Sequence, residues 1–408
     1  MVAISRPDDH VRMRYLPPEF VSSDSPSDDA PNDQRRRVLA AWVRLGLLAG
    51  VPGIALTGCG GGGDDTVADT GTAPATAPAP APAPSPAPAP TPAPAPAPPT
   101  GIRYGDLRGA DLGPQASLNG AVPFPASHAW NTDISAAPVD PSSATILASI
   151  GLTNALRPDF GAGLWDGGPI GIPYHVVAGS QARVTVRMVG YPDESDPGPY
   201  PLPAGVSIEG GGASDGDRHV LVIDRDNQRL YELYRAFPQA DGSWNADIGA
   251  VFHLDSMTAR PTAQPGWTSA DAAGLPIFPG LVRYDEASRG PGGILHALRF
   301  TAPRTRSAYV PPATHSASSS TDPALPPMGL RVRLRGSFVI PAGFSAEARA
   351  VLQALKTYGM FLADHGSAWY LSGAPDERWN NSRLQSELGQ VKGSDFEVIR
   401  MDGLVTTR

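Results

Sequence analysis

Four side chains able to do acid–base or metal chemistry stand close together in the sequence, between positions 209 and 219. Glu209 precedes two glycines, and Asp217, Arg218 and His219 come just before the apolar run Val220 to Ile223. If that run is a strand that begins early, Asp217 and His219 lie on one face, because side chains alternate along a strand. A carboxylate and an imidazole on one face suit general acid–base catalysis or two ligands of a metal site. The alternative is a structural Asp–Arg pair beside a histidine whose hydrogen bonds are satisfied.

Other histidines are weaker candidates. His296 lies inside a predicted strand, where an imidazole is more often structural, and we place it beside the same catalytic site. His315 lies in a Ser/Thr-rich loop that would suit the rim of an active site. His365 follows Asp364 at the expected end of a helix, where the helix dipole favours a cation.

A short acidic segment between prolines, residues 192–201, is a candidate binding loop. It contains Glu194, Asp196 and Tyr200. Carboxylates on a rigid loop suit Ca²⁺, which prefers oxygen ligands, and a tyrosine there can also lie against a sugar ring. A solvated turn is the alternative, and the sequence identifies no other cofactor.

Aromatic residues near the C-terminus form a second candidate binding region. Trp369 and Trp379, with the amides Asn380 and Asn381, have the composition of many sugar-binding surfaces, and tryptophans are equally good core residues. The G-x-S-x-G match at 212–216 lies in a glycine-rich turn before a strand, whereas a serine hydrolase needs a strand before the motif and a helix after it.

Composition and charge narrow the classes of partner. The chain has 46 prolines, 13 of them between positions 71 and 100, so a protein of long helices is excluded. Up to position 58 acidic and basic residues balance at 7 each, which leaves 40 − 7 = 33 carboxylates and 32 − 7 = 25 cations for the rest. No basic footprint for nucleic acid is present. No apolar run is long enough for a transmembrane helix.

The first hundred residues indicate where the protein resides. Arg35 to Arg37 precede an apolar stretch that ends in Leu56-Thr-Gly-Cys59, which has the three parts of a secretory signal. The last four residues resemble a bacterial lipobox, whose cysteine receives a diacylglycerol. We expect Cys59 to anchor the chain to the cell envelope. The expected destination is the outer membrane or cell surface, because Gly60 stands where an inner-membrane retention signal has an aspartate. The arginines suit either a twin-arginine signal or an ordinary export signal.

The expected organisation has three parts. Residues 1–58 are an extension and signal peptide, and residues 59–100 are a disordered Gly-rich and Ala-Pro linker that would extend as polyproline II. Residues 101–408 are a β-rich globular domain. Strands are expected at 183–189, 219–223, 229–234, 294–301 and 330–340, and helices at 144–156 and 345–366. This pattern predicts a β-sandwich or jelly-roll core with one or two packed helices.

Several longer stretches are specific enough to suggest a family. They include Trp130 to Ser135, Asp193 to Pro201, Gly216 to Asp224, Gly266 to Pro276, His296 to Thr301, Pro326 to Leu334, and Ala354 to Met360 followed by Ala363 to Ser367. Together they resemble a family of large secreted bacterial proteins, some joined to carbohydrate-type accessory modules. The resemblance implies a secreted setting and the domain boundaries, and it implies no activity. The family pattern has asparagine where this chain has His365, which argues against a catalytic role for that histidine.

These observations lead to two functional hypotheses. The first is a cell-surface lipoprotein whose domain acts on a polysaccharide or glycoconjugate as a hydrolase or lyase, with Glu209 and Asp217 in acid–base roles and His219 and His296 lining the site. Arg218 and the loop and aromatic residues named above would bind the ligand. The second is a non-catalytic glycan-binding or envelope-structural lipoprotein.

Overall fold

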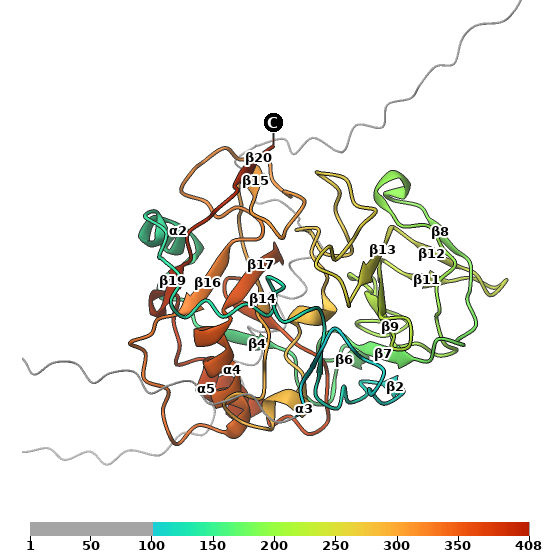
Figure 1. The fold of residues 1–408 in the computed structure, drawn as a ribbon, viewed down its shortest axis with the longest axis horizontal. Coiled ribbons are helices and arrows are strands. Elements are labelled where there is room, and N and C mark those ends of the chain that lie inside the picture. The colour runs from blue at the N-terminus through green and yellow to red at the C-terminus, as the bar shows by residue number, and fades with distance from the viewer. Residues whose placement is uncertain (1–100, 408) are drawn as a thin grey trace, which may run out of the picture. The chain divides into compact units, whose positions relative to one another are not determined.

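The computed structural model describes residues 101–407, which form several sheets of short strands and few helices (Figure 1). The predicted mainly-β class is therefore confirmed for this region. The signal peptide, Cys59 and the proline-rich linker lie outside the described residues.

One mixed sheet has five strands in the spatial order β13-β10-β9-β7-β2. β9 and β10 form the antiparallel hairpin expected from the sequence, while β7 runs parallel to β9. The strands are β13 (Ile248–His253), β10 (Arg229–Tyr234), β9 (Val220–Asp224), β7 (Tyr174–Val177) and β2 (Gly113–Pro114).

The second large sheet has six strands in the order β19-β16-β17-β14-β18-β4. It is also mixed, because β14 runs parallel to β17 and β18 runs parallel to β4. The strands are β19 (Phe396–Val398), β16 (Arg331–Leu334), β17 (Met360–His365), β14 (Leu298–Ala302), β18 (Tyr370–Ser372) and β4 (Arg157–Asp159).

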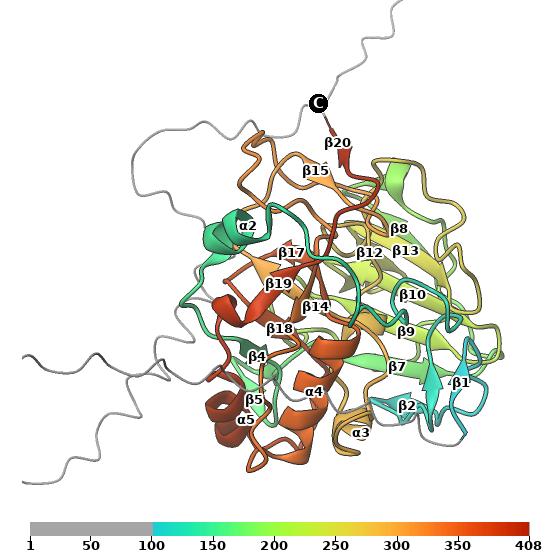
Figure 2. The same ribbon diagram turned by 60° about the vertical axis from the view of Figure 1, so that its left-hand side comes forward.

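Smaller strand groups, four α-helices and three short 3₁₀ helices complete the described region. Figures 1 and 2 show α4 and α5 beside the six-stranded sheet, where α4 contacts β16 and α5 contacts β4. The α-helices are α2 (Ser143–Ile150), α3 (Tyr284–Ala287), α4 (Ala346–Thr357) and α5 (Asn381–Leu388). The smaller groups are β11 (Phe237–Pro238) with β12 (Trp244–Ala246) and β8 (Val186–Met188), β1 (Arg103–Tyr104) with β3 (Ala121–Val122), β5 (Leu164–Trp165) with β6 (Gly168–Pro169), and β15 (Ala308–Tyr309) with β20 (Val405–Thr406).

The finer prediction of a sandwich or jelly roll is not confirmed. Those architectures are built from antiparallel sheets, and both large sheets here contain parallel pairs. Parallel neighbours need crossover connections. A list of expected strands does not reveal which of them pair in this way.

The long C-terminal helix is shorter than predicted. Ser345 caps α4 as expected, its hydroxyl accepting a hydrogen bond from the backbone N–H of Ala348 at 3.2 Å. The helix ends at Thr357, and Gly359 has a φ of +68° in the left-handed region. The apolar residue Leu362, counted in the helical pattern, therefore lies in β17. Asp364 and His365 lie at the end of a strand, so the helix dipole does not act on His365.

The five-stranded sheet has a hydrophobic core on each of its two faces. Along β9, Leu221 and Ile223 belong to the larger core, which also includes residues of the six-stranded sheet. Val220 and Val222 belong to the smaller core on the other face. Each strand residue is therefore buried, and a polar side chain on the larger-core face points into the interior of the protein.

Candidate functional site

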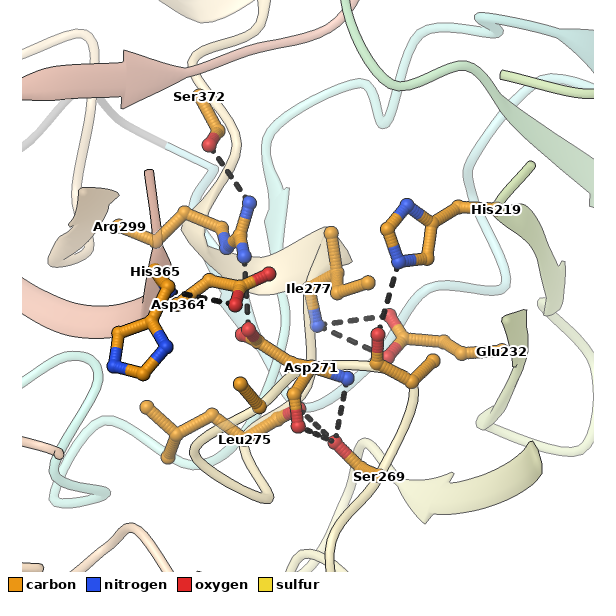
Figure 3. A network of polar contacts seen from close by, with 12 residues as sticks. His219, Glu232, Ser269, Asp271, Leu275, Ile277, Arg299, Asp364, His365 and Ser372 are labelled. Carbon is orange, nitrogen blue, oxygen red and sulfur yellow. Dashed lines mark hydrogen bonds and ion pairs between the residues drawn. The ribbon is translucent and has the colours of Figure 1, made fainter. Parts of the chain in front are cut away.

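Polar side chains from both large sheets meet in this interior, and Figure 3 shows most of them. We call them the carboxylate cluster. Its members are Glu209, Asp217, His219, Glu232, Asp271, Arg299 and Asp364. His219 and Glu232 come from the β9–β10 side, Arg299 from β14 and Asp364 from β17. Asp271 lies on the loop between the sheets.

His219 is held by hydrogen bonds at both ring nitrogens. Its Nδ1 lies 2.6 Å from a carboxylate oxygen of Glu209, and its Nε2 lies 2.9 Å from the carbonyl oxygen of Ala270. Burial is the largest influence on the pKa of His219 and lowers it, but the charge and hydrogen bond of Glu209 outweigh burial and raise the pKa to about 9. His219 is therefore an imidazolium at neutral pH that donates to both oxygens.

Asp217 is the half-buried member next to this pair. One oxygen of Asp217, one of Glu209 and one ring nitrogen of His219 lie within 4.8 Å of one another. The sequence predicted this proximity, although for a different reason. The strand begins at Val220 and Arg218 has a φ of +49°, so a turn rather than strand alternation brings Asp217 to His219.

This trio has the composition of a three-ligand metal site, yet its hydrogen bonds favour a proton. A metal ligand needs an unprotonated ring nitrogen. Both nitrogens of His219 already face oxygen acceptors, one of them a backbone carbonyl that cannot donate in return. The geometry fits a protonated histidine that keeps Glu209 ionised.

Arg299 holds the side of the cluster formed by the six-stranded sheet. Its guanidinium donates to Asp271 Oδ1 at 2.9 Å and to Ser372 Oγ at 2.7 Å. Burial raises the pKa of Asp271 to about 7 against the opposing charge of Arg299. The other oxygen of Asp271 is buried without a hydrogen-bond partner. Burial therefore disfavours the ionised form of Asp271, while its ion pair with Arg299 favours that form.

The pKa values of two more carboxyl groups in the cluster are also raised. Burial raises the pKa of Glu232 to about 7, although backbone N–H groups of Ile277 and Phe278 donate to its oxygens at 2.9–3.0 Å. Burial also raises the pKa of the half-buried Asp364, and the nearby charge of Asp217 adds to the effect. Strong pKa shifts of this kind are concentrated at functional sites.

The sequence missed four members of the cluster. Glu232, Asp271, Arg299 and Asp364 were not selected because they lie singly within strands or loops. A signal was present for three of them, since Asp271, Arg299 and Asp364 fall within stretches that suggested the family resemblance.

His296 lies in a different charged group, which we call the Arg283 triad. Arg283 donates to Glu286 Oε1 at 2.8 Å, and His296 Nε2 lies 3.1 Å from Glu286 Oε2. Burial alone would raise the pKa of Glu286, but the charges of Arg283 and His296 lower it to about 2. The prediction that His296 lines the same site as Glu209 is not confirmed. Its contacts are with Arg283 and Glu286, which is the structural role given as the alternative.

The acidic loop, predicted as a binding loop, contains a buried ion pair. Asp196 accepts hydrogen bonds from Arg260 Nε at 2.7 Å, from the backbone of Val251 and from the hydroxyl of Thr262. The hydroxyl of Tyr200 is buried and donates to the carbonyl of Asp196. Because Asp196 already neutralises a buried guanidinium, its contacts favour a structural role over the predicted binding of Ca²⁺ or a ligand.

The remaining loop residue, Glu194, also has a structural partner. Its carboxylate accepts a hydrogen bond from the backbone N–H of Thr268 at 2.9 Å. The segment 192–196 is thus fastened to the chain around 260–268.

Both tryptophans expected at a sugar-binding surface are core residues. Trp369 is fully buried, with its ring stacked between Phe300 and Phe396 at centroid distances of 5.4 and 5.0 Å. Trp379 is also buried and packs against Phe160. These rings offer no surface to a ligand, so the prediction of a binding role is corrected.

Arg218 fastens the glycine-rich loop beside the cluster. Its guanidinium donates to the carbonyl groups of Gly211, Gly212 and Ser214 at 2.6–3.4 Å. The side chain is buried, so its role is to fix the loop between Glu209 and Asp217. Residues 212–216 are a loop, as expected for a chance match to the hydrolase motif.

Comparisons of the chain with models of protein families, with curated proteins and with solved structures found no match in any of the three. Within residues 101–407, no helix combines the length and the apolar character needed to cross a membrane.

Proposed function

We propose that the domain cleaves glycosidic bonds of a polysaccharide or glycoconjugate with carboxyl groups of the carboxylate cluster. The observation that supports this most strongly is the placement of Asp217 and Asp364. Both are half-buried, and they lie close enough for the charge of Asp217 to raise the pKa of Asp364. Behind them, burial holds further carboxyl groups partly protonated near neutral pH.

The two kinds of carboxyl group needed for glycoside hydrolysis are both available. The His219 imidazolium, 2.6 Å away, keeps Glu209 ionised, which suits a nucleophile or base. Burial and the nearby charge of Asp217 raise the pKa of Asp364, so the protonated form needed of an acid is favoured at this end of the cluster. Glu209 and Asp217 have oxygens within 4.8 Å of each other. Separations of about 5 Å are typical of retaining enzymes, so we expect retention of anomeric configuration.

The test is a screen of full-length protein, in detergent, against soluble glycans. Reducing ends report hydrolysis, and ultraviolet absorbance of unsaturated products reports a lyase. Asp217→Asn and Glu209→Gln are expected to lower turnover by about 10²-fold or more. Asp215→Asn is the matched control, because Asp215 is an exposed acid two residues from Asp217.

Three results would contradict the proposal: turnover that survives both variants, an equal loss in the control, or no turnover on any glycan. Retention of a glycan by the native protein without turnover would support the second hypothesis, a non-catalytic binding module.

We also propose that Cys59 carries a diacylglycerol and holds the domain at the cell envelope. Two acyl chains provide stable anchoring without a membrane-spanning helix, since each buried CH₂ contributes about 0.8 kcal/mol. Mass spectrometry of the native N-terminus and fractionation of a Cys59→Ala variant test this. An unmodified thiol, or a different first residue, would contradict it.

A further inference from the structure

We infer that Tyr234 is a substrate-binding residue at the edge of the carboxylate cluster, where its hydroxyl donates a hydrogen bond to an uncharged oxygen of a sugar ring. This inference rests on the proposed function and narrows the substrate to a polysaccharide that is neutral at this position. The sequence predicts only that Tyr234 ends a strand.

Tyr234 is the last residue of β10 and shares a face of that strand with Glu232. Side chains two positions apart in a strand point the same way. Glu232 is fully buried within the cluster, whereas Tyr234 is half-buried and packs against the larger core. The strand therefore carries Glu232 into the interior and Tyr234 to the edge of the cluster.

Two contacts place Tyr234 beside His219 and Asp217. The centroid of its ring lies 5.5 Å from that of His219, with an angle of 44° between the ring planes. In the main chain, the N–H of the next residue, Arg235, donates to the carbonyl oxygen of Asp217 at 2.9 Å. Tyr234 thus lies at the half-buried end of the cluster, where Asp217 is.

The hydroxyl of Tyr234 is available to a ligand as a hydrogen-bond donor. Within residues 101–407 no hydrogen bond engages it, and it is not one of the buried polar atoms that lack a partner, so water can reach it. Burial and the charge of Asp217 raise the pKa of Tyr234 to about 12. The phenol therefore keeps its proton at neutral pH.

A bound sugar needs a donor of this kind, because the nearby polar groups are acceptors or are already engaged. Ionised carboxylates only accept hydrogen bonds. Both ring nitrogens of His219 face oxygen atoms of the protein, and Arg299 is buried with its guanidinium bonded to interior residues. A sugar hydroxyl both donates and accepts, so it can donate to Asp217 and accept from Tyr234.

The charge around Tyr234 favours an uncharged group. Asp217 and Asp364 both act to raise the pKa of the phenol, so their negative charges reach it. The adjacent cation, Arg235, is paired with Asp247 at 3.0 Å. A sugar carboxylate placed here would be repelled, whereas a hydroxyl or ring oxygen would not.

Affinity electrophoresis in native gels and steady-state turnover, both with the full-length protein in detergent, test the inference. Mixed-linkage β-glucan, xyloglucan and galactomannan are the neutral probes, and polygalacturonate is the anionic probe. We expect at least one neutral probe to be cleaved and to retard the protein more than polygalacturonate does. Tyr234→Phe keeps the ring against His219 and removes only the hydroxyl, so affinity for that probe and kcat/KM should each fall roughly tenfold.

Tyr231→Phe is the matched control, because Tyr231 lies on the same strand and belongs to the smaller core on the opposite face. It should bind and cleave the probe within about twofold of the native protein. Urea denaturation should give Tyr234→Phe the midpoint of the native protein, so that its losses report the missing hydrogen bond and not unfolding.

The inference is overturned if Tyr234→Phe binds and cleaves the probe like the native protein, if Tyr231→Phe loses as much, if Tyr234→Phe is destabilised, or if polygalacturonate is bound as tightly. Cleavage by the native protein in any of these cases would leave the proposed function standing. Binding of a neutral probe that depends on Tyr234, without cleavage by the native protein, would overturn the proposed catalysis and keep the inference. Neither binding nor cleavage of any probe would overturn both.

Discussion

The carboxylate cluster and the Arg283 triad are built from the same residue types and have opposite electrostatic character. In the triad one buried carboxylate faces Arg283 and His296, and its pKa is lowered to about 2. In the cluster, five carboxyl groups share Arg299 and His219, and the pKa values of Glu232 and Asp271 are raised to about 7. The balance of charge, rather than burial alone, decides which group can exchange protons near neutral pH.

This difference also separates the two histidines selected from the sequence. His219 is bound to a carboxylate and a carbonyl at the half-exposed end of the cluster. His296 is almost fully buried and donates from Nδ1 to the carbonyl of Ala297 at 2.8 Å. Variants of the Arg283 triad can therefore serve as structural controls for variants of the carboxylate cluster.

The largest expected difference is in turnover. His219→Gln should lower turnover on a cleaved glycan by about 10²-fold or more, because Glu209 loses the cation that keeps it ionised. His296→Gln should leave turnover per folded molecule within about twofold. Steady-state rates, normalised to folded protein by circular dichroism, measure both. Equal losses would show that the two histidines do not differ in function.

The next largest effect is on stability. Here we expect the variant in the Arg283 triad to lose more than the variant in the carboxylate cluster. Glu286→Gln leaves the buried Arg283 without its carboxylate and should lower the free energy of unfolding by about 3–5 kcal/mol. Asp217→Asn, at a half-buried position, should change it by less than about 1 kcal/mol. Urea denaturation measures both values. A larger loss for Asp217→Asn would mean that the cluster is structural.

The two regions should also respond to pH in opposite directions. Glu286 has a lowered pKa in the folded state, so the stability it contributes is present above about pH 4.5 and is lost as pH falls towards 2. Glu232 and Asp271 have raised pKa values of about 7, so folding becomes less favourable as pH rises from about 4 to 7. His219 adds to this, because its contribution is complete below about pH 6.5 and is lost through about pH 9.

We therefore expect stability to be greatest near about pH 5 and to fall by a few kcal/mol by about pH 9. Asp271→Asn should flatten the decrease on the alkaline side, while Glu286→Gln should flatten the decrease on the acidic side. Urea midpoints recorded at intervals of pH provide the measurement. Stability that rises steadily from pH 5 to 9 would contradict the raised pKa values.

The smallest effect is expected at His365. Its Nε2 lies 2.7 Å from the hydroxyl of Thr305, and burial lowers its pKa. The bond from its backbone N–H to Asp364 Oδ1 persists in any variant. His365→Asn should change stability by less than about 1 kcal/mol and turnover by less than about twofold. A tenfold loss of turnover would place His365 in the catalytic group.

Local sequence signals determined much of the secondary structure. The hairpin of β9 and β10 follows from two apolar runs and a polar turn, and the start of α4 follows from Ser345 and the helical apolar spacing. The proximity of Glu209, Asp217 and His219 was also predicted, because these residues lie within eleven positions of one another. In these cases the interacting groups are close in the chain.

Tertiary structure alone decided what is distant in the chain. Asp271, Arg299 and Asp364 reach the cluster through a loop and the parallel pairing of β14 with β17, which no local pattern specifies. Burial likewise decided that Trp369 is a core residue while Trp165 is exposed. Local spacing fixes the faces of single elements, but the assembly of the two sheets determines which faces meet and which groups lose water. The charge states of the cluster follow from that loss of water and from the number of cations that share it.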